Sequence, residues 1–437
     1  MKYLLTTLLT ACIITHGWGQ SRSIDNYLED AVLHFTLDTS LSANGREFFD
    51  SLLADNHYFI LGEYHGSVQI SRLTNALLPL YAKHGGKVFG LEIGPQASRQ
   101  INDGMARETA AAFFGRLNGA YTIVTAERPY TPIPFFRSAG DARFLQTAFD
   151  HGLTTIGLDQ ENLFSYPLLI DSLIGTLPAA DVDLRTLART LRDSVAIYLE
   201  RGVTAQARGG SRREGLAVKL EESAFLQRAL GALAAGGPRA EEVVASLRTS
   251  NAIYYHHGIG DWWNSNRLRT ENFVDNFREA LVPDGTVSEE RLFLKIGGLH
   301  AAKGMNNYYR YDIGNLIYET ARLTGRKSLH TVIIDRFWVQ EDGEWTDSLE
   351  DSTSWLATNL GQLLQAGKPD RWTVIDLAKV RKQGLYGKDV HPTVRQYFER
   401  YDLFIIPPAD LEPKLLSNSQ PSGRNMSTQK GGLQGTY

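Results

Sequence analysis

Cysteine is almost absent from this chain of 437 residues, where Cys12 is the only one. It lies in an N-terminal segment that is typical of an export signal, with a positive end, an apolar run, and small residues at Gly17 and Gly19. Cleavage before Gln20 would remove residues 1–19 and leave a mature protein with neither a disulfide nor a thiol nucleophile. The alternative is a lipoprotein signal, with Cys12 as the lipidated residue. We therefore expect a secreted or periplasmic protein.

Other absences narrow the possible functions. The 45 Lys and Arg residues are scattered and are outnumbered by 49 Asp and Glu residues, so nothing indicates a nucleic-acid partner. The N-terminal apolar run is too short to span a bilayer, and we expect no transmembrane segment in the mature chain. The Gly-x-Ser-x-Gly motif of serine hydrolases and the His-Glu-x-x-His motif of zinc peptidases do not occur.

Short apolar stretches alternate with amphipathic ones along most of the chain. A strand expected at 57–62 precedes a helix at 67–83 and a second strand at 88–93, which predicts two neighbouring parallel strands. The pattern indicates an α/β fold with a mainly parallel central sheet flanked by helices. Further strands are expected at 154–158, 292–296, 331–334, 372–375 and 403–406.

Between about residues 166 and 282 the strand pattern disappears and amphipathic helices replace it. We expect a helical insertion that packs over the sheet edge, within a single α/β domain covering residues 20–417. Residues 418–437 have little to bury and are expected to be disordered. The Pro-rich loop at 128–141 carries aromatic residues and is expected to be mainly structural.

Ionisable residues follow four of the expected strands. The carboxyl ends of parallel strands meet at one edge of a sheet, and ligands bind at that edge. Burying several acids together is costly unless they serve a function, so the pattern predicts one functional site. Each residue alone would be equally compatible with a structural role. The candidates are Glu63 and His65, Glu92, Asp159 and Glu161, and His300.

These residue types favour chemistry on an activated water. An imidazole can take a proton from water, a carboxylate can orient and charge that imidazole, and another group can stabilise the oxyanion. The same side chains could instead hold a divalent metal ion with an open position for water. Glu63-x-His65 is not a standard zinc motif, so the metal ligands are unknown and no cofactor is firmly indicated.

A second candidate region is IYYHHGIGDWWNSNRLR, residues 253–269. It is interpreted either as a packing corner between helices, since Tyr and Trp fill cores well, or as a pocket wall. Adjacent histidines on a helix point about 100° apart, so His256 and His257 are not expected to serve one site together. We take His257 as the substrate-binding candidate of the two.

Five short motifs occur in this chain in the order ILGEYHG, VFGLEIG, GLDQEN, RTENFVDNF and KIGGLHAAKG. Their order and spacing resemble those of the erythromycin-esterase-like and ChaN-like superfamily, to which the Tiki proteases are related. The likeness covers most of residues 57–305. It implies a hydrolase in which His65 activates water, with Glu63 and Glu92 as carboxylate partners and His300 as a second imidazole. Arg269 matches the Arg that begins the family's Arg-Asp helix. A small-molecule substrate is expected to contact Arg269, Asp159, Glu161 and His257.

The chain also departs from the esterase pattern. Only Tyr64 separates Glu63 from His65, where esterase members usually have two residues, and this spacing is closer to the haem-associated ChaN-like branch. The esterase His-Asn-x-His pattern is replaced by GGLH in this chain, and Thr270 stands where the family often has Asp. Two alternatives therefore stay open: a haem- or metal-binding protein without hydrolytic activity, and a metal-dependent peptidase similar to Tiki.

Overall fold

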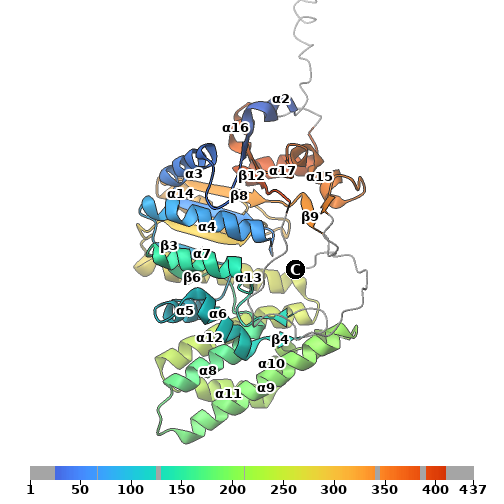
Figure 1. The fold of residues 1–437 in the computed structure, drawn as a ribbon. Coiled ribbons are helices and arrows are strands. Elements are labelled where there is room, and N and C mark those ends of the chain that lie inside the picture. Colours follow the sequence, from blue (N-terminus) through green and yellow to red (C-terminus); the bar gives the residue numbers. More distant parts are fainter. Residues whose placement is uncertain are drawn as a thin grey trace, which may run out of the picture.

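A computed structural model of the chain describes residues 25–65, 67–124, 129–210, 212–339, 345–383 and 390–409. Its centre is an eight-stranded sheet (Figure 1). The strands follow one another in the order β1 (Val32–Phe35), β11 (Trp372–Asp376), β12 (Leu403–Ile406), β8 (Ser328–Ile333), β2 (Tyr58–Glu63), β7 (Leu292–Gly297), β3 (Val88–Leu91) and β6 (Thr154–Gly157). The strands from β12 to β6 are parallel, whereas β11 is antiparallel to both its neighbours. The predicted mainly parallel α/β fold is confirmed.

The predicted strand pair 57–62 and 88–93 is not a neighbouring pair. β7, which comes much later in the chain, lies between β2 and β3 and pairs in parallel with both. Consecutive strands neighbour each other in only about two-thirds of cases, and no local pattern reveals a strand inserted from far along the chain. The direction of the strands was predicted correctly, so their carboxyl ends still share one edge.

Side chains that alternate along the strands supply two hydrophobic cores, one on each face. On β2, Phe59 and Leu61 belong to a core shared with α3 (Ala43–Asp55), α4 (Val68–Lys83) and α7 (Ala139–Asp150). Tyr58 and Ile60 belong to a core shared with α13 (Trp262–Leu281) and α14 (Ile313–Leu323). Figure 1 shows α3, α4 and α7 in front of the sheet. The helices outside the insertion are α2 (Asp25–Leu28), α3 (Ala43–Asp55), α4 (Val68–Lys83), α5 (Pro95–Met105), α6 (Ala110–Tyr121), α7 (Ala139–Asp150), α14 (Ile313–Leu323), α15 (Trp355–Leu364), α16 (Leu377–Lys382) and α17 (Pro392–Arg400).

The helical insertion has a hydrophobic core of its own and lies beyond the β6 edge of the sheet (Figure 1). Glu242 on α12 (Pro238–Gly258) forms an ion pair with Arg99 on α5, and α12 leads directly into α13, which packs on the sheet. No described residue between 166 and 282 belongs to a strand. Its helices are α8 (Tyr166–Thr176), α9 (Val182–Ala207), α10 (Leu216–Glu222), α11 (Ala224–Ala234), α12 (Pro238–Gly258) and α13 (Trp262–Leu281).

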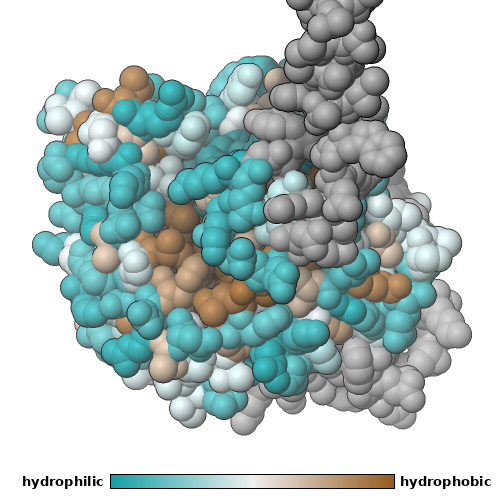
Figure 2. Space-filling view, turned by 90° about the horizontal axis from the view of Figure 1, so that it is seen from above, coloured by the Kyte–Doolittle hydropathy of each residue, from teal (hydrophilic) through white to brown (hydrophobic). Residues whose placement is uncertain are grey.

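Two small hairpins complete the described structure: β4 (Ile123–Val124) with β5 (Pro129–Tyr130), and β9 (Phe337–Val339) with β10 (Trp345–Asp347). Seen from above, the surface is mainly hydrophilic, and hydrophobic residues gather in a band across its middle (Figure 2). Within the described ranges, no helix is both long enough and apolar enough to cross a membrane. The predicted signal segment, Cys12 and the predicted disordered tail lie outside the described residues.

A buried histidine in β8 makes the stability of this sheet depend on pH. Nδ1 of His330 lies 2.8 Å from the carbonyl oxygen of Ala301, and Nε2 lies 3.0 Å from Oγ of Ser328. Burial lowers the pKa of His330 from 6.5 to about 4, so the folded protein keeps this imidazole neutral. Between pH 6.5 and about 4 the unfolded chain binds a proton that the folded chain does not, which favours unfolding.

We therefore expect the free energy of unfolding to fall as the pH is lowered from about 6.5 to about 4, by up to about 3 kcal/mol from this group alone. Urea unfolding of the wild type and of His330→Gln across this range measures the effect. The difference in stability between the two proteins should change with pH in that window. A constant difference would show that His330 is not held neutral.

Candidate active site

The end of β2 places His65 between two carboxylates. Glu63 is the last residue of the strand, and its Oε1 lies 2.9 Å from Nδ1 of His65. The other oxygen of Glu63 lies 2.5 Å from Nζ of Lys295, which comes from the neighbouring strand β7. Nε2 of His65 points in the opposite direction and lies 3.4 Å from Oε2 of Glu92. The imidazole is therefore oriented by Glu63 and directed at Glu92.

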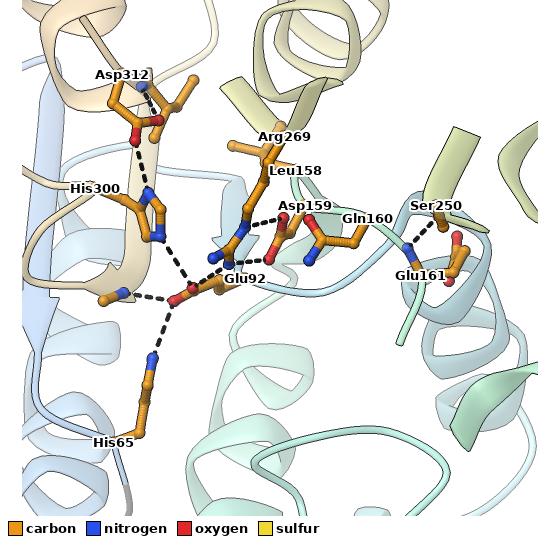
Figure 3. A network of polar contacts seen from close by, with 12 residues as sticks. His65, Glu92, Leu158, Asp159, Gln160, Glu161, Ser250, Arg269, His300 and Asp312 are labelled. Atoms are coloured by element: carbon orange, nitrogen blue, oxygen red, sulfur yellow. Dashed lines mark hydrogen bonds and ion pairs between the residues drawn. The ribbon is translucent and has the colours of Figure 1, made fainter. Parts of the chain in front are cut away.

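Glu92 is at the centre of the cluster, one residue beyond β3 (Figure 3). Its Oε2 accepts a hydrogen bond from the backbone N–H of Gly297 at 2.5 Å, and its Oε1 accepts one from Nη2 of Arg269 at 2.8 Å. Nε2 of His300 lies 3.8 Å from the same Oε1. Figure 3 shows the imidazoles of His65 and His300 on opposite sides of this carboxylate.

His300 has the same kind of support as His65. Its Nδ1 lies 2.7 Å from Oδ2 of Asp312, the residue that caps the N-terminus of α14. Asp312 is buried and also accepts a hydrogen bond from Nδ2 of Asn306 at 3.0 Å. Each histidine is thus fixed through Nδ1 by one acid, and the two Nε2 atoms converge on Glu92.

Arg269 joins this centre to the end of β6. Its Nε and Nη2 bind the two carboxylate oxygens of Asp159 at 3.0 and 2.5 Å, and Nη2 also reaches Glu92. The side-chain amide of Asn276, two turns further along α13, donates to the carbonyl oxygens of Leu158 and Asp159. Helix α13 therefore holds the guanidinium against two strand ends.

Charged neighbours keep the acids ionised despite their burial. Burial opposes ionisation of Glu63, but Lys295 and His65 outweigh it and lower the pKa of Glu63 to about 2. Burial opposes the charge of Glu92 too, and His65, His300 and Arg269 lower its pKa. For His65, burial disfavours the imidazolium, but Glu92 and Glu63 outweigh it and raise the pKa. The centre is therefore built for an imidazole that gains a proton easily.

Glu161 and His257 lie in different surroundings. The carboxylate of Glu161 is fully buried and accepts hydrogen bonds from the backbone N–H groups of Gln96 and Ala97, at the N-terminus of α5, and from Oγ of Ser246. Burial raises the pKa of Glu161 to about 7. Because these partners lie on α5 and on α12, the hydrogen bonds of Glu161 link α5 to the helical insertion. His257 packs edge-on against Trp262, with ring centroids 4.1 Å apart, and its contact with a substrate stays a prediction.

The sequence pattern did not single out three residues that touch the candidate site. Lys295 is a charged residue inside an otherwise apolar strand, and this was its only sequence signal. Asp312 is marked in the sequence only as the acid preceding a helix. Phe135, from the Pro-rich loop expected to be mainly structural, stacks on His65 with ring centroids 4.3 Å apart. Its φ of 68° is unusual for a bulky residue, and such backbone strain is common at functional sites.

Arg269 should also be essential for stability. Its removal would leave Glu92 and Asp159 buried without their shared counter-charge, which typically costs about 3 to 5 kcal/mol. We expect Arg269→Met to lower the free energy of unfolding by this amount in urea melts. The matched control is Arg267→Met, since Arg267 pairs with Glu271 at the surface and should change stability by less than about 1 kcal/mol. Equal losses in the two variants would contradict the prediction.

The described residues do not fit a resident metal ion well. No group of three or more His, Cys, Asp or Glu side chains in the described ranges is arranged to hold one. Arg269 and Lys295 instead supply positive charge directly to Glu92 and Glu63. A cation at this centre would have to compete with both side chains.

No family model matches the chain, and no curated protein matches it. Solved structures do resemble it. A succinoglycan biosynthesis protein has a TM-score of 0.55 at 14% identity, over 90% of this chain and 98% of that one. A Bacillus cereus protein has a TM-score of 0.50 at 13% identity, over 91% and 98% of the two chains.

A histidine-to-asparagine mutant of the erythromycin esterase EreC, in its open conformation, is also similar to this chain. Its TM-score is 0.51 at 13% identity, over 86% of this chain and 96% of that one. At such low identity the likeness is one of fold alone. The chain therefore shares its overall fold with these three proteins.

Proposed function

We propose that this protein is a hydrolase that cleaves an ester, lactone or amide bond with a water activated by His65. The observation that carries the proposal is the pair of imidazoles, each oriented through Nδ1 by an acid, whose Nε2 atoms converge on Glu92. The fold shared with an erythromycin esterase is consistent with it.

His65 is suited to act as the general base. Glu63 stays ionised beside Lys295 and accepts a hydrogen bond from Nδ1–H of His65, which leaves the Nε2 lone pair to face Glu92. The 3.4 Å and 3.8 Å distances from Glu92 to the two Nε2 atoms exceed those of good hydrogen bonds. A water that donates a proton to Nε2 of His65 would therefore lie at the edge of the Glu92 carboxylate.

The reaction follows from these positions. His65 takes a proton from water, and the hydroxide adds to the carbonyl carbon of the substrate. Glu63 and Glu92 stabilise the imidazolium that forms. Arg269, held by Asp159, is the group that we assign to stabilise the tetrahedral oxyanion. His65 then returns the proton to the leaving oxygen or nitrogen when the carbonyl–leaving-group bond breaks.

A screen of activated esters, lactones and amides with the purified protein, with and without a chelator, tests the proposal. We expect turnover that the chelator does not affect, because Lys295 and Arg269 supply the positive charge of the centre. Loss of activity with the chelator would favour the peptidase alternative. An absorption spectrum recorded with added haem tests the other alternative, and a Soret shift without any turnover would overturn the hydrolase proposal.

A further inference from the structure

Four exposed aromatic side chains lie on two segments that also contact the candidate site, α13 and the loop before α14. They are Trp262, Trp263, Tyr309 and Tyr311, which together we call the aromatic shelf. The exposed fractions are largest for Tyr309 and Tyr311, at 75% and 62%, and Trp263 is 60% exposed. Trp and Tyr are enriched where binding energy is concentrated, and a group of them that is exposed near a candidate site indicates a binding surface.

Helix α13 connects one half of the shelf to the candidate site. Trp262 precedes Arg269 by seven residues, so the two lie on the same face of the helix, about 10 Å apart along its axis. Further along α13, Asn276 binds the end of β6, and the helix then leads toward the start of β7. Trp262 and Trp263 are thus at the outer end of α13, beyond the carboxyl edge of the sheet.

The loop that carries Tyr309 and Tyr311 is tied to the other side of the candidate site. Arg310 lies between these tyrosines in sequence, and its guanidinium stacks 3.6 Å from the ring centroid of Trp263, which joins the loop to α13. Asn306, at the base of the loop, donates to Asp312, the acid that orients His300. The two halves of the shelf are therefore fixed to each other and to the candidate site.

Tyr309 has a conformation that the chain would not adopt without a reason. Its φ is 57°, in the left-handed region where bulky residues are rare. The turn is held by Asn306, whose side-chain oxygen accepts hydrogen bonds from the backbone N–H groups of Tyr308 and Arg310. A strained position that presents the most exposed tyrosine ring of the described structure is typical of a binding surface.

The chemistry of the shelf favours one kind of ligand. The rings offer flat apolar faces, whereas the phenol hydroxyls and the Arg310 guanidinium need polar partners if a ligand covers them. A sugar ring has an apolar face of C–H groups and a rim of hydroxyls, and satisfies both demands. A protein partner on this surface would cover the candidate site and would not deliver a substrate to it.

We propose that the aromatic shelf binds the sugar of a carbohydrate ester and so defines the substrate class of the hydrolytic centre. This inference rests on the proposed hydrolase function. Water adds to the acyl carbonyl, the bond between the carbonyl carbon and the sugar oxygen breaks, and the products are a carboxylic acid and the free sugar hydroxyl. The shelf holds the sugar while the acyl group lies at His65.

Binding is measured by tryptophan fluorescence in a His65→Ala background, so that it does not depend on turnover. The probes are partially O-acetylated xylohexaose and cellohexaose. Trp263→Ala and Tyr309→Gly should each weaken binding by about tenfold. Tyr309→Gly also relieves the positive φ, so its melting temperature should not fall, which separates loss of binding from loss of folding.

Trp355→Ala is the matched control, since Trp355 is 53% exposed on α15 and outside the shelf. It should leave binding unchanged. Failure of both probes to bind at millimolar concentration, or equal binding with and without Trp263, would overturn the proposal. Preference for a sugar-free macrocyclic lactone would overturn the carbohydrate assignment. Binding through the shelf without turnover by the wild type would support the shelf and contradict only the hydrolase proposal.

Discussion

Replacement of His65 by Ala is expected to lower kcat/KM by about a thousandfold, the contribution typical of a well-placed general base. The loss should appear mainly in kcat, because the imidazole acts on water in the transition state and does not hold the substrate. The measurement is a steady-state assay with the best ester found for the wild type. Circular dichroism and urea melts of the same preparation show whether the fold is intact.

Two variants make this result specific. His151→Ala removes an exposed imidazole at the end of α7 and should retain wild-type activity. Lys295→Met keeps His65 but removes the ammonium that holds Glu63 ionised, and should reduce activity by less than His65→Ala does. Full turnover by His65→Ala would assign the base to another residue and refute the proposed roles of Glu63 and His65.

The convergence of ionisable groups was predictable because parallel strands impose it. Glu63, His65, Glu92, Asp159 and His300 each follow a strand whose apolar pattern is clear in the sequence. In a parallel sheet their positions along the chain translate directly into positions at one edge. The structure brings all five into a single cluster, although β7 separates the two strands that were expected to be neighbours.

What the sequence could not predict depends on pairing across the sheet. Lys295 meets Glu63 only because β7 lies beside β2, and that neighbour relation joins segments far apart in the chain. A strand was expected at 331–334, but β8 begins at Ser328 and includes His330. The imidazole of His330 is buried there with two hydrogen-bonding partners, which a periodicity argument does not foresee.

The second large effect should come from Glu92. Its charge favours the imidazolium form of His65, and the base works only when it is neutral. For the wild type, kcat/KM should therefore rise with pH, and the midpoint of this ascending limb of the pH profile is the raised pKa of His65. Glu92→Gln removes the negative charge that is first among the groups raising this pKa, so the limb should move to lower pH.

The maximum activity of Glu92→Gln should fall at the same time, by about a hundredfold, because the amide cannot accept from both Gly297 and Arg269 or stabilise the imidazolium equally well. Glu271→Gln, which removes an exposed acid on α13, is the matched control and should change neither the ascending limb nor the maximum activity.

Since the pKa of Glu92 is lowered, Glu92 is ionised throughout the assay range and should add no descending limb to the wild-type profile. A descending limb that disappears in Glu92→Gln would instead make Glu92 the proton donor. If the ascending limb of the pH profile moves in neither Glu92→Gln nor Glu63→Gln, neither acid is coupled to the base. His65 would then have to be activated by another group.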